Sequence, residues 1–155
     1  MLSNNPENWL LFTRIVRFGE TDAAGVIHFH NLLRWCHEAW EDSLCKYGLN
    51  YSDIFPSGEY SESRVKIALP IVHCEANFRF PIKAGDNLEI TLVPEKVDMT
   101  SFQVQSKFKC DGKQAAESII RHIAINPETR QRCDLPEDIN RWLEASSINL
   151  GPRPL

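Results

Sequence analysis

The longest periodic stretch of the chain runs from Phe29 to Tyr47. Apolar residues recur there at intervals of three and four, which is the spacing of a helix with one buried face. Gly48 follows directly, where a left-handed residue commonly ends a helix. At about 1.5 Å per residue, the predicted helix is roughly 28 Å long. Its apolar positions are Leu32, Leu33, Cys36, Trp40, Leu44 and Tyr47.

The pattern elsewhere is mostly that of β-strands. Residues 10–18 are rich in strand-forming side chains and predict a first strand ahead of the helix. After the helix, apolar and polar residues alternate, as in strands with one buried face. Leu69-Pro70 predicts a break or bulge, and Asp111-Gly112 predicts a hairpin turn. The alternating apolar sets are Val72, Cys74, Ala76, Phe78 and Phe80; Leu88, Ile90 and Leu92; and Phe102, Val104 and Phe108, with a last strand that reaches Ile125.

Two other segments complete the order of elements. Residues 50–63 are rich in Ser, Gly, Pro and Tyr and predict a mobile connection. Pro136, followed by Ile139, Trp142 and Leu143, predicts a short C-terminal helix. A strand, one long helix and then four or more antiparallel strands make an α+β domain. Wrapping the sheet around the helix is the simplest way to bury both apolar faces.

Composition limits the classes of function. A chain of 155 residues fits a single domain, 1–155. The net charge of −4, with acidic and basic residues interspersed, argues against a nucleic-acid-binding surface. Five scattered cysteines without a C-x-x-C pair indicate reduced cytosolic thiols that act mainly as small core residues. No leader or bilayer-length apolar run is visible, so a soluble, cytoplasmic protein without membrane contact is expected.

Asp22 lies between Gly19 and Gly25, just ahead of the predicted helix. The first amide N–H groups of a helix have no partner within the helix, so they can stabilise a developing oxyanion. A carboxylate beside such donors can act as nucleophile or general base in thioester hydrolysis. The alternative is that Asp22 is a turn residue whose carboxylate accepts nearby backbone N–H groups.

The run from Arg17 to Asn31 resembles the signature of the 4-hydroxybenzoyl-CoA thioesterase branch of the hotdog-fold thioesterases. The matching residues are Phe18, Glu20, Asp22, Gly25, Val26, Ile27 and Asn31. The resemblance implies a hotdog fold, with Asp22 as the catalytic carboxylate. It also implies that the backbone N–H of Phe29, with that of His28 beside it, polarises the thioester carbonyl. A homotetramer built from two dimers, with sites formed between subunits, is implied in the same way.

Two further segments, Cys36–Glu41 and Ala68–His73, look most like the cyanobacterial 1,4-dihydroxy-2-naphthoyl-CoA hydrolases of phylloquinone synthesis. This resemblance implies a flat bicyclic acyl-CoA substrate, with Gly25, Asn31 and His73 as substrate-binding candidates. His73 has the alternative of an outward-facing strand residue. A 4-hydroxybenzoyl-CoA or short-chain acyl-CoA thioesterase is the second reading, and a non-catalytic protein that binds acyl thioesters is the third.

Other chemistry finds little support in the sequence. The segment His37-Glu38-x-x-Glu41 lacks the second histidine of a zincin, so His28 and His30 predict no metal site, and no cofactor is expected. His37 stands where many family members have an acid, with Glu38 next to it; either can instead be a hydrogen-bonded polar residue of the packing. There is neither a G-x-S-x-G elbow nor a phosphate-binding loop. Coenzyme A would therefore be held by surface bases, for which the candidates are Arg64, Arg79, Lys83 and Arg121.

Overall fold

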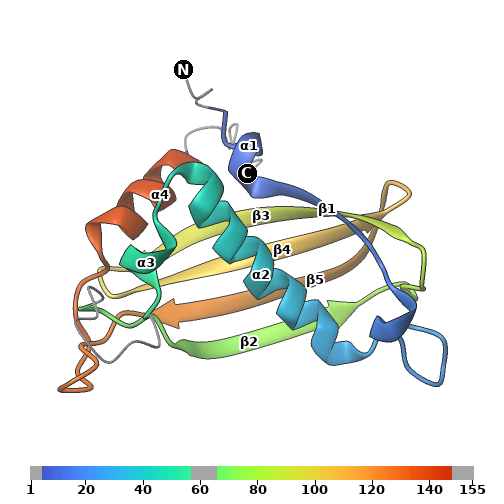
Figure 1. Cartoon of the computed structure of the whole chain (residues 1–155), viewed down its shortest axis with the longest axis horizontal. Helices are drawn as coiled ribbons and strands as arrows, with labels where there is room; N and C mark the ends of the chain where they lie inside the picture. The colour runs from blue at the N-terminus through green and yellow to red at the C-terminus, as the bar shows by residue number, and fades with distance from the viewer. Residues whose placement is uncertain (1–4, 57–65, 148–155) are drawn as a thin grey trace, which may run out of the picture.

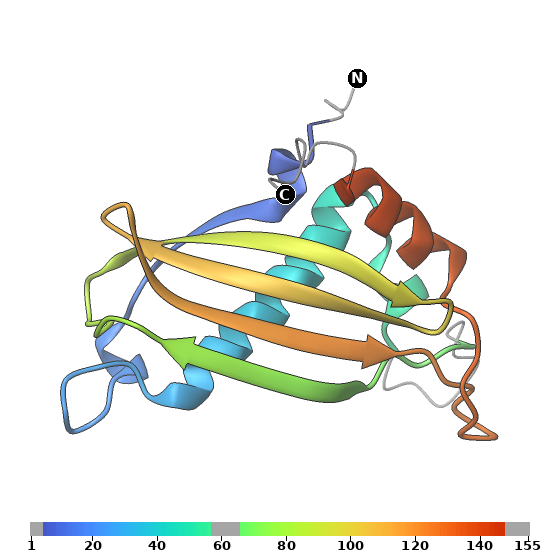
Figure 2. The ribbon, with the colours of Figure 1, turned by 180° about the vertical axis from the view of Figure 1, so that it is seen from behind.

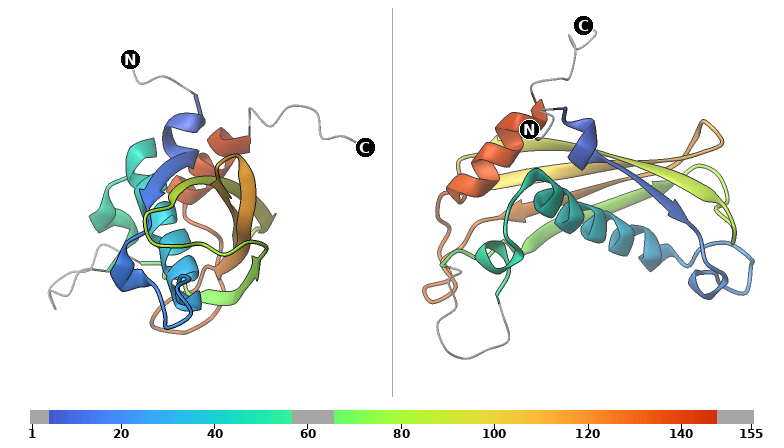
Figure 3. Two further views of the ribbon diagram at one scale, coloured as in Figure 1. Left: turned by 90° about the vertical axis from the view of Figure 1, so that its right-hand side faces the viewer. Right: turned by 45° about the horizontal axis from the view of Figure 1, so that its top comes forward.

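The computed structural model describes residues 5–56 and 66–147. A long helix, α2 (Phe29–Tyr47), lies across one face of a curved five-stranded antiparallel sheet (Figures 1 and 3). Figure 2 shows the sheet from behind, with the strands in front of α2. The strand order is β1-β3-β4-β5-β2. The strands are β1 (Leu11–Ile15), β2 (Ile71–Phe78), β3 (Asn87–Asp98), β4 (Ser101–Cys110) and β5 (Lys113–Ile123). The predicted α+β order, one helix wrapped by an antiparallel sheet, is confirmed.

The long helix begins and ends where the periodicity predicts. Gly48 has φ 116°, a conformation that glycine adopts without a Cβ clash, and its N–H donates to the carbonyl of Cys45 at 3.0 Å. The buried stripe differs in detail from the prediction: Trp35 and Ala39 are buried, whereas Leu33 and Tyr47 are only partly buried. Pairs of neighbouring residues at intervals of four face the sheet, so the stripe is wider than a single row of residues.

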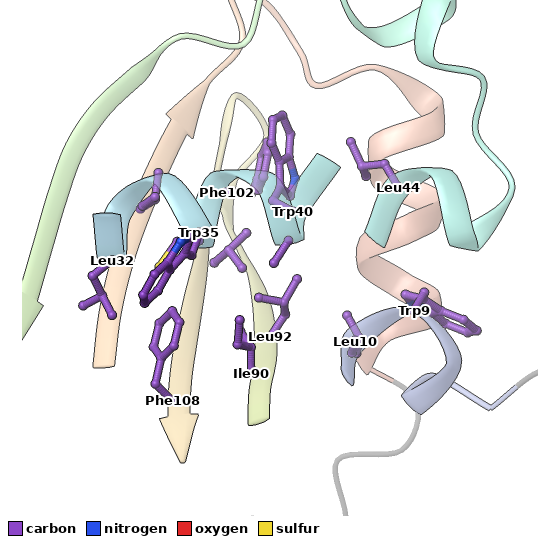
Figure 4. Packing of buried hydrophobic residues seen from close by; sticks show 14 of the residues in the cluster. Trp9, Leu10, Leu32, Trp35, Trp40, Leu44, Ile90, Leu92, Phe102 and Phe108 are labelled. Carbon is purple, nitrogen blue, oxygen red and sulfur yellow. The ribbon is translucent and has the colours of Figure 1, made fainter. Parts of the chain in front are cut away.

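The core lies between α2 and the sheet (Figure 4). Leu32 and Trp35 of the helix are almost completely buried, as are Phe102 and Phe108 of β4. Each such side chain contributes roughly 1.5–3 kcal/mol through removal of apolar surface from water. The N-terminal half of α2, which leads into the Asp22 loop, is therefore anchored to the sheet by large side chains.

Three shorter helices flank this layer: α1 (Glu7–Leu10), α3 (Tyr51–Ile54) and α4 (Glu137–Ser147). The predicted C-terminal helix is confirmed as α4, and indole N–H groups tie it to its neighbours. Trp9 donates to the hydroxyl of Ser146 at 3.0 Å, and Trp142 donates to that of Ser43 at 3.1 Å. The sequence reading missed α1 and α3 because four residues are too few to show helical periodicity.

The burial of side chains on β2 differs from the prediction. Alternation placed Val72, Cys74 and Phe78 on a buried face, but all three are exposed, and only Ala76 of this strand is partly buried. β2 is the last strand of the sheet and pairs with β5 alone among the described strands, so one edge and much of its apolar surface face outward. Phe80 lies beyond the end of the strand and is 52% exposed.

The remaining differences are small. β1 ends at Ile15 rather than at Phe18, which lies in a 3-10 turn, η1 (Phe18–Glu20). β5 ends at Ile123, and the register of β2 shifts just after the Leu69-Pro70 pair. The Asp111-Gly112 hairpin is confirmed, with positive φ at both residues, as a type I′ turn requires. All five cysteines are free, but only Cys36 is buried, so the prediction that they are mainly core residues was wrong. Among the described helices, none combines the length and apolarity needed to cross a membrane.

Candidate active site

The loop that carries Asp22 is a closed and well-defined turn. The carboxylate Oδ1 of Asp22 accepts the N–H of Ala24 at 2.8 Å, and the N–H of Asp22 donates to the carbonyl of Val26 at 2.8 Å. Gly25 has φ 78°, so its missing Cβ is what allows the chain to reverse here. The turn interaction expected of Asp22 is therefore present, but it uses one carboxylate oxygen and leaves Oδ2 for other chemistry.

A cavity of about 400 Å³ opens beside Asp22. Its walls come from the Asp22 loop, the start of α2 and the segment that follows β2. The lining is mostly apolar and aromatic, the usual character of a small-molecule site. The lining residues are Asp22, Val26, Ile27, Phe29, Phe78, Arg79, Phe80, Pro81 and Ile82. Phe29 was expected at the site for its backbone N–H, whereas Phe78 and Phe80 were not identified as site residues because both were assigned to the buried face of a strand.

The first turn of α2 presents one of the two predicted oxyanion donors. The backbone N–H of His28 donates to the carbonyl of Glu20 at 2.9 Å, so it is not free to polarise a thioester. The N–H of Phe29 has no hydrogen-bond acceptor within the described part of the chain, and its side chain lines the cavity. The imidazoles of His28 and His30 lie in contact through their Nδ1 atoms. Of the two predicted donors, only the Phe29 N–H, at the positive end of the helix dipole, therefore lacks a hydrogen-bond acceptor among the described residues.

Asn31 and Gly25 hold the loop in shape and are not among the residues that line the cavity. Asn31 is 4% exposed, and its side-chain amide donates to the carbonyl of Glu20 at 2.8 Å. Gly25 supplies the left-handed turn described above. Both were expected to bind substrate; in this chain their contacts fix the backbone between η1 and α2.

Glu20 is a residue of the site whose role the sequence did not show. Its carboxylate accepts the guanidinium of Arg14 at 2.5 Å, the indole N–H of Trp35 at 3.3 Å and the backbone N–H of Arg17 at 2.9 Å. Burial raises the pKa of Glu20, but the Arg17 N–H and the Arg14 guanidinium outweigh it, so the net shift is downward. Glu20 is therefore an anion at neutral pH, two residues from Asp22.

His73 and most of the basic candidates lie outside the cavity. His73 is exposed on β2 beside Glu75, with Nε2 3.1 Å from a carboxylate oxygen, which matches the outward-facing alternative. Arg121 donates to Gln103 at 2.9 Å, and the Lys83 side chain is exposed. Arg79 lines the cavity and pairs with Glu117 at 2.7 Å. Arg64 lies outside the described residues.

The polar residues of α2 that stood out in the sequence make contacts at its partly exposed surface. Glu38 accepts hydrogen bonds from Arg14 and Arg34, which matches the alternative of a hydrogen-bonded polar residue. His37 lies 3.4 Å from the carboxylate of Glu41. In the described part of the chain, no three His, Cys, Asp or Glu side chains gather as metal ligands would.

Comparison with known proteins shows the family of this chain. A protein from Prochlorococcus marinus strain MIT 9313 named 1,4-dihydroxy-2-naphthoyl-CoA hydrolase is 60% identical over 144 residues, which cover 93% of this chain and 95% of that protein. A protein of the same name from Synechococcus sp. strain WH7803 is 52% identical over 141 residues, covering 91% of this chain and 92% of that one.

Solved structures agree. A crystal structure from Prochlorococcus marinus strain MIT 9313 aligns with a TM-score of 0.88 at 60% identity, over 92% of this chain and 99% of that chain. A 1,4-dihydroxy-2-naphthoyl-CoA thioesterase from Synechocystis aligns with a TM-score of 0.78 at 26% identity, over 86% of this chain and 94% of that chain. The predicted hotdog fold is confirmed. Residues 16–143 match the thioesterase-like superfamily, and the chain belongs to this family.

Proposed function

We propose that this chain hydrolyses 1,4-dihydroxy-2-naphthoyl-CoA to 1,4-dihydroxy-2-naphthoate and free coenzyme A, a step of phylloquinone biosynthesis. The observation that carries the proposal is the aromatic cavity beside Asp22, in a chain with relatives of that name at 60% identity. A flat bicyclic acyl group has two faces to bury, and rings on the cavity wall suit it better than they suit a short aliphatic chain.

The catalytic carboxylate is Asp22. Its Oδ1 is held by the Ala24 N–H, so the side chain is oriented while Oδ2 stays available in the cavity. From that position the carboxylate either attacks the thioester carbon or removes a proton from the water that does so. In both routes the C–S bond breaks, coenzyme A leaves as its thiolate, and one water molecule is consumed.

The helix start stabilises the charge that develops on the thioester oxygen. An oxyanion within about 3 Å of the Phe29 N–H would accept a hydrogen bond that no residue of the described chain uses. Removal of one oxyanion-hole donor typically costs about 100- to 1000-fold in kcat. Of the natural residues only proline at position 29 would delete this backbone donor, so for every other residue the shape of the loop and the helix start secures it.

Arg79 is the first basic residue to consider for coenzyme A. It is the one of the three described basic candidates that lines the cavity. Its guanidinium is bound on one side by Glu117, which leaves other N–H donors for a phosphate or an amide carbonyl.

Assembly into a homotetramer of two dimers is part of the proposal. β2 offers an edge that no other described strand pairs with, beside exposed apolar side chains, among them Val72, which is 50% exposed. A second copy that pairs along β2 would cover this edge and would bring a neighbouring subunit close to Phe78 and Phe80. We also place the protein in the cytoplasm, which its free thiols suit.

The test is a comparison of kcat/KM across dihydroxynaphthoyl, 4-hydroxybenzoyl, butyryl and acetyl thioesters of coenzyme A, with wild type and Asp22→Asn. The naphthoyl substrate should exceed the aliphatic ones by about 100-fold, since about 2.7 kcal/mol of ring contact realised in the transition state suffices. Asp22→Asn should lower kcat by orders of magnitude, because the amide is neither nucleophile nor base.

Melting temperature, measured on the same samples, separates chemistry from folding. In the Asp22→Asn variant the amide oxygen of the new side chain can still accept the Ala24 N–H, so Tm should change little. Equal kcat/KM values across the four thioesters would overturn the naphthoyl assignment but not the hydrolase. Retained turnover by Asp22→Asn would remove this carboxylate from the mechanism.

A further inference from the structure

The two ends of the segment from Glu20 to His28 lie side by side, and we call this junction the neck of the loop. Thr21 pairs with Ile27 in an isolated antiparallel bridge. Just outside this bridge, the Glu20 carbonyl accepts two donors, the N–H of His28 at 2.9 Å and the side-chain amide of Asn31 at 2.8 Å. One carbonyl therefore fixes both the end of the loop and the first turn of α2.

The Glu20 side chain anchors that carbonyl to the rest of the molecule. It is 11% exposed, and its two oxygens receive Arg14 from β1, Trp35 from α2 and the backbone of Arg17. The Arg14 guanidinium also lies over the Trp35 ring, 4.8 Å from its centroid. Trp35 is 1% exposed and packs on Phe108 of β4, with ring centroids 6.4 Å apart. The loop is thereby connected to fully buried side chains of the core.

Stability alone is a weak reason for such an arrangement. Burial of a carboxylate and a guanidinium costs several kcal/mol, which their attraction and hydrogen bonds do little more than offset. Orientation is a stronger reason, because Asp22 and the Phe29 N–H lie on opposite sides of the neck that Glu20 closes. A misplacement of about 1 Å at either group can cost about 100-fold in rate.

We propose that Glu20 is a positioning residue of the hydrolase: its carbonyl and its carboxylate together set the distance between the Asp22 carboxylate and the Phe29 N–H. This inference rests on the proposed function for its kinetic readout, but not for its structural one. It assigns no contact between Glu20 and the substrate.

The test compares Glu20→Gln and Glu20→Ala with the matched control Glu38→Gln. Glu38 binds the same Arg14 guanidinium, at 3.3 Å, but is 40% exposed and contacts no atom of the loop in the described structure. Glu20→Gln keeps an acceptor for the Arg17 N–H and loses the charge, whereas Glu20→Ala loses both. We expect kcat to fall about 10-fold in Glu20→Gln and about 100-fold in Glu20→Ala, with KM within about threefold of wild type. Glu38→Gln should keep kcat within about twofold.

Hydrogen exchange gives a readout that requires no turnover. The His28 amide should exchange faster in both Glu20 variants and at the wild-type rate in Glu38→Gln, since only the Glu20 variants loosen its acceptor. Wild-type kcat in Glu20→Ala, or an equal loss in Glu38→Gln, would overturn the positioning role. If wild type fails to hydrolyse the naphthoyl thioester, the proposed function fails, whereas unchanged His28 exchange in Glu20→Ala would refute this inference alone.

Discussion

His122 should make the stability of the fold depend on pH well above the range in which carboxylates titrate. It lies on β5 in the core and is 1% exposed. Its ring packs against those of Trp40 and Phe102, with centroids 4.4 and 5.0 Å away, and these two rings also contact each other. Nδ1 is 2.9 Å from the carbonyl of Leu69, so this nitrogen carries the proton of the neutral imidazole and donates it. A second proton would place a charge beside two aromatic rings in the core.

The magnitude follows from the pKa. Burial lowers the pKa of His122 from 6.5 to about 4, the hydrogen bond to Leu69 opposes this, and His37, whose ring centroid is 6.1 Å away, adds to it. Between these two pH values the unfolded chain binds the proton and the folded chain does not. The contribution of His122 to the free energy of unfolding is therefore fully present above pH 6.5 and decreases as the pH is lowered towards 4. From about pH 7.5 to about pH 5.0 the expected loss is about 2 kcal/mol.

The assay is urea unfolding at several pH values in that window, with wild type, His122→Phe and the control His73→Gln. Phenylalanine preserves the aromatic stack and takes no proton, so its free energy of unfolding should vary far less with pH, whatever its absolute value. His73 is exposed on β2, and its replacement should keep the wild-type slope. The window ends near pH 5 because Glu20 and Glu117, whose pKa values are lowered, add their own losses in more acidic solution. An acid loss of the same size in His122→Phe would refute the reasoning.

Two further predictions concern the cavity and the sheet edge. Phe80→Ala should lower kcat/KM for the dihydroxynaphthoyl thioester by about 10-fold and for the butyryl thioester by less, because the lost ring is a wall of the cavity. Kinetics measured in parallel with both substrates check this prediction, and equal losses would contradict it. If the proposed homotetramer forms through β2, Val72→Asp should dissociate it, since a charge on this exposed strand cannot be buried against a second copy. Sedimentation with activity at the same concentration measures this effect, and a fully active monomer would count against a site formed between subunits.

Periodicity was a good guide wherever one chain buries its own surface. The long helix and its Gly48 end, the β3–β4–β5 meander and the Asp111-Gly112 turn follow from local patterns whose partners lie in the same chain. It failed at β2, where the alternation is real but the described chain covers the apolar side only at Ala76. An apolar pattern indicates that a surface is to be buried; it does not say whether the same chain buries it.

The sequence drew attention to the right loop but did not show which contacts each of its residues makes. Asp22 stood out as a carboxylate between glycines ahead of a helix, but that pattern also fits a turn residue, and the catalytic role was implied by the resemblance to the thioesterase signature. Glu20, Gly25 and Asn31 belong to the same signature, yet the hydrogen bonds of Glu20 and Asn31 and the left-handed φ of Gly25 serve to shape the backbone. His28 shows the limit most clearly. The His28 N–H lies just before the helix and the Phe29 N–H at its first residue, so the sequence does not distinguish them. The carbonyl of Glu20, eight residues upstream, accepts the His28 N–H and leaves only the Phe29 N–H without an acceptor among the described residues.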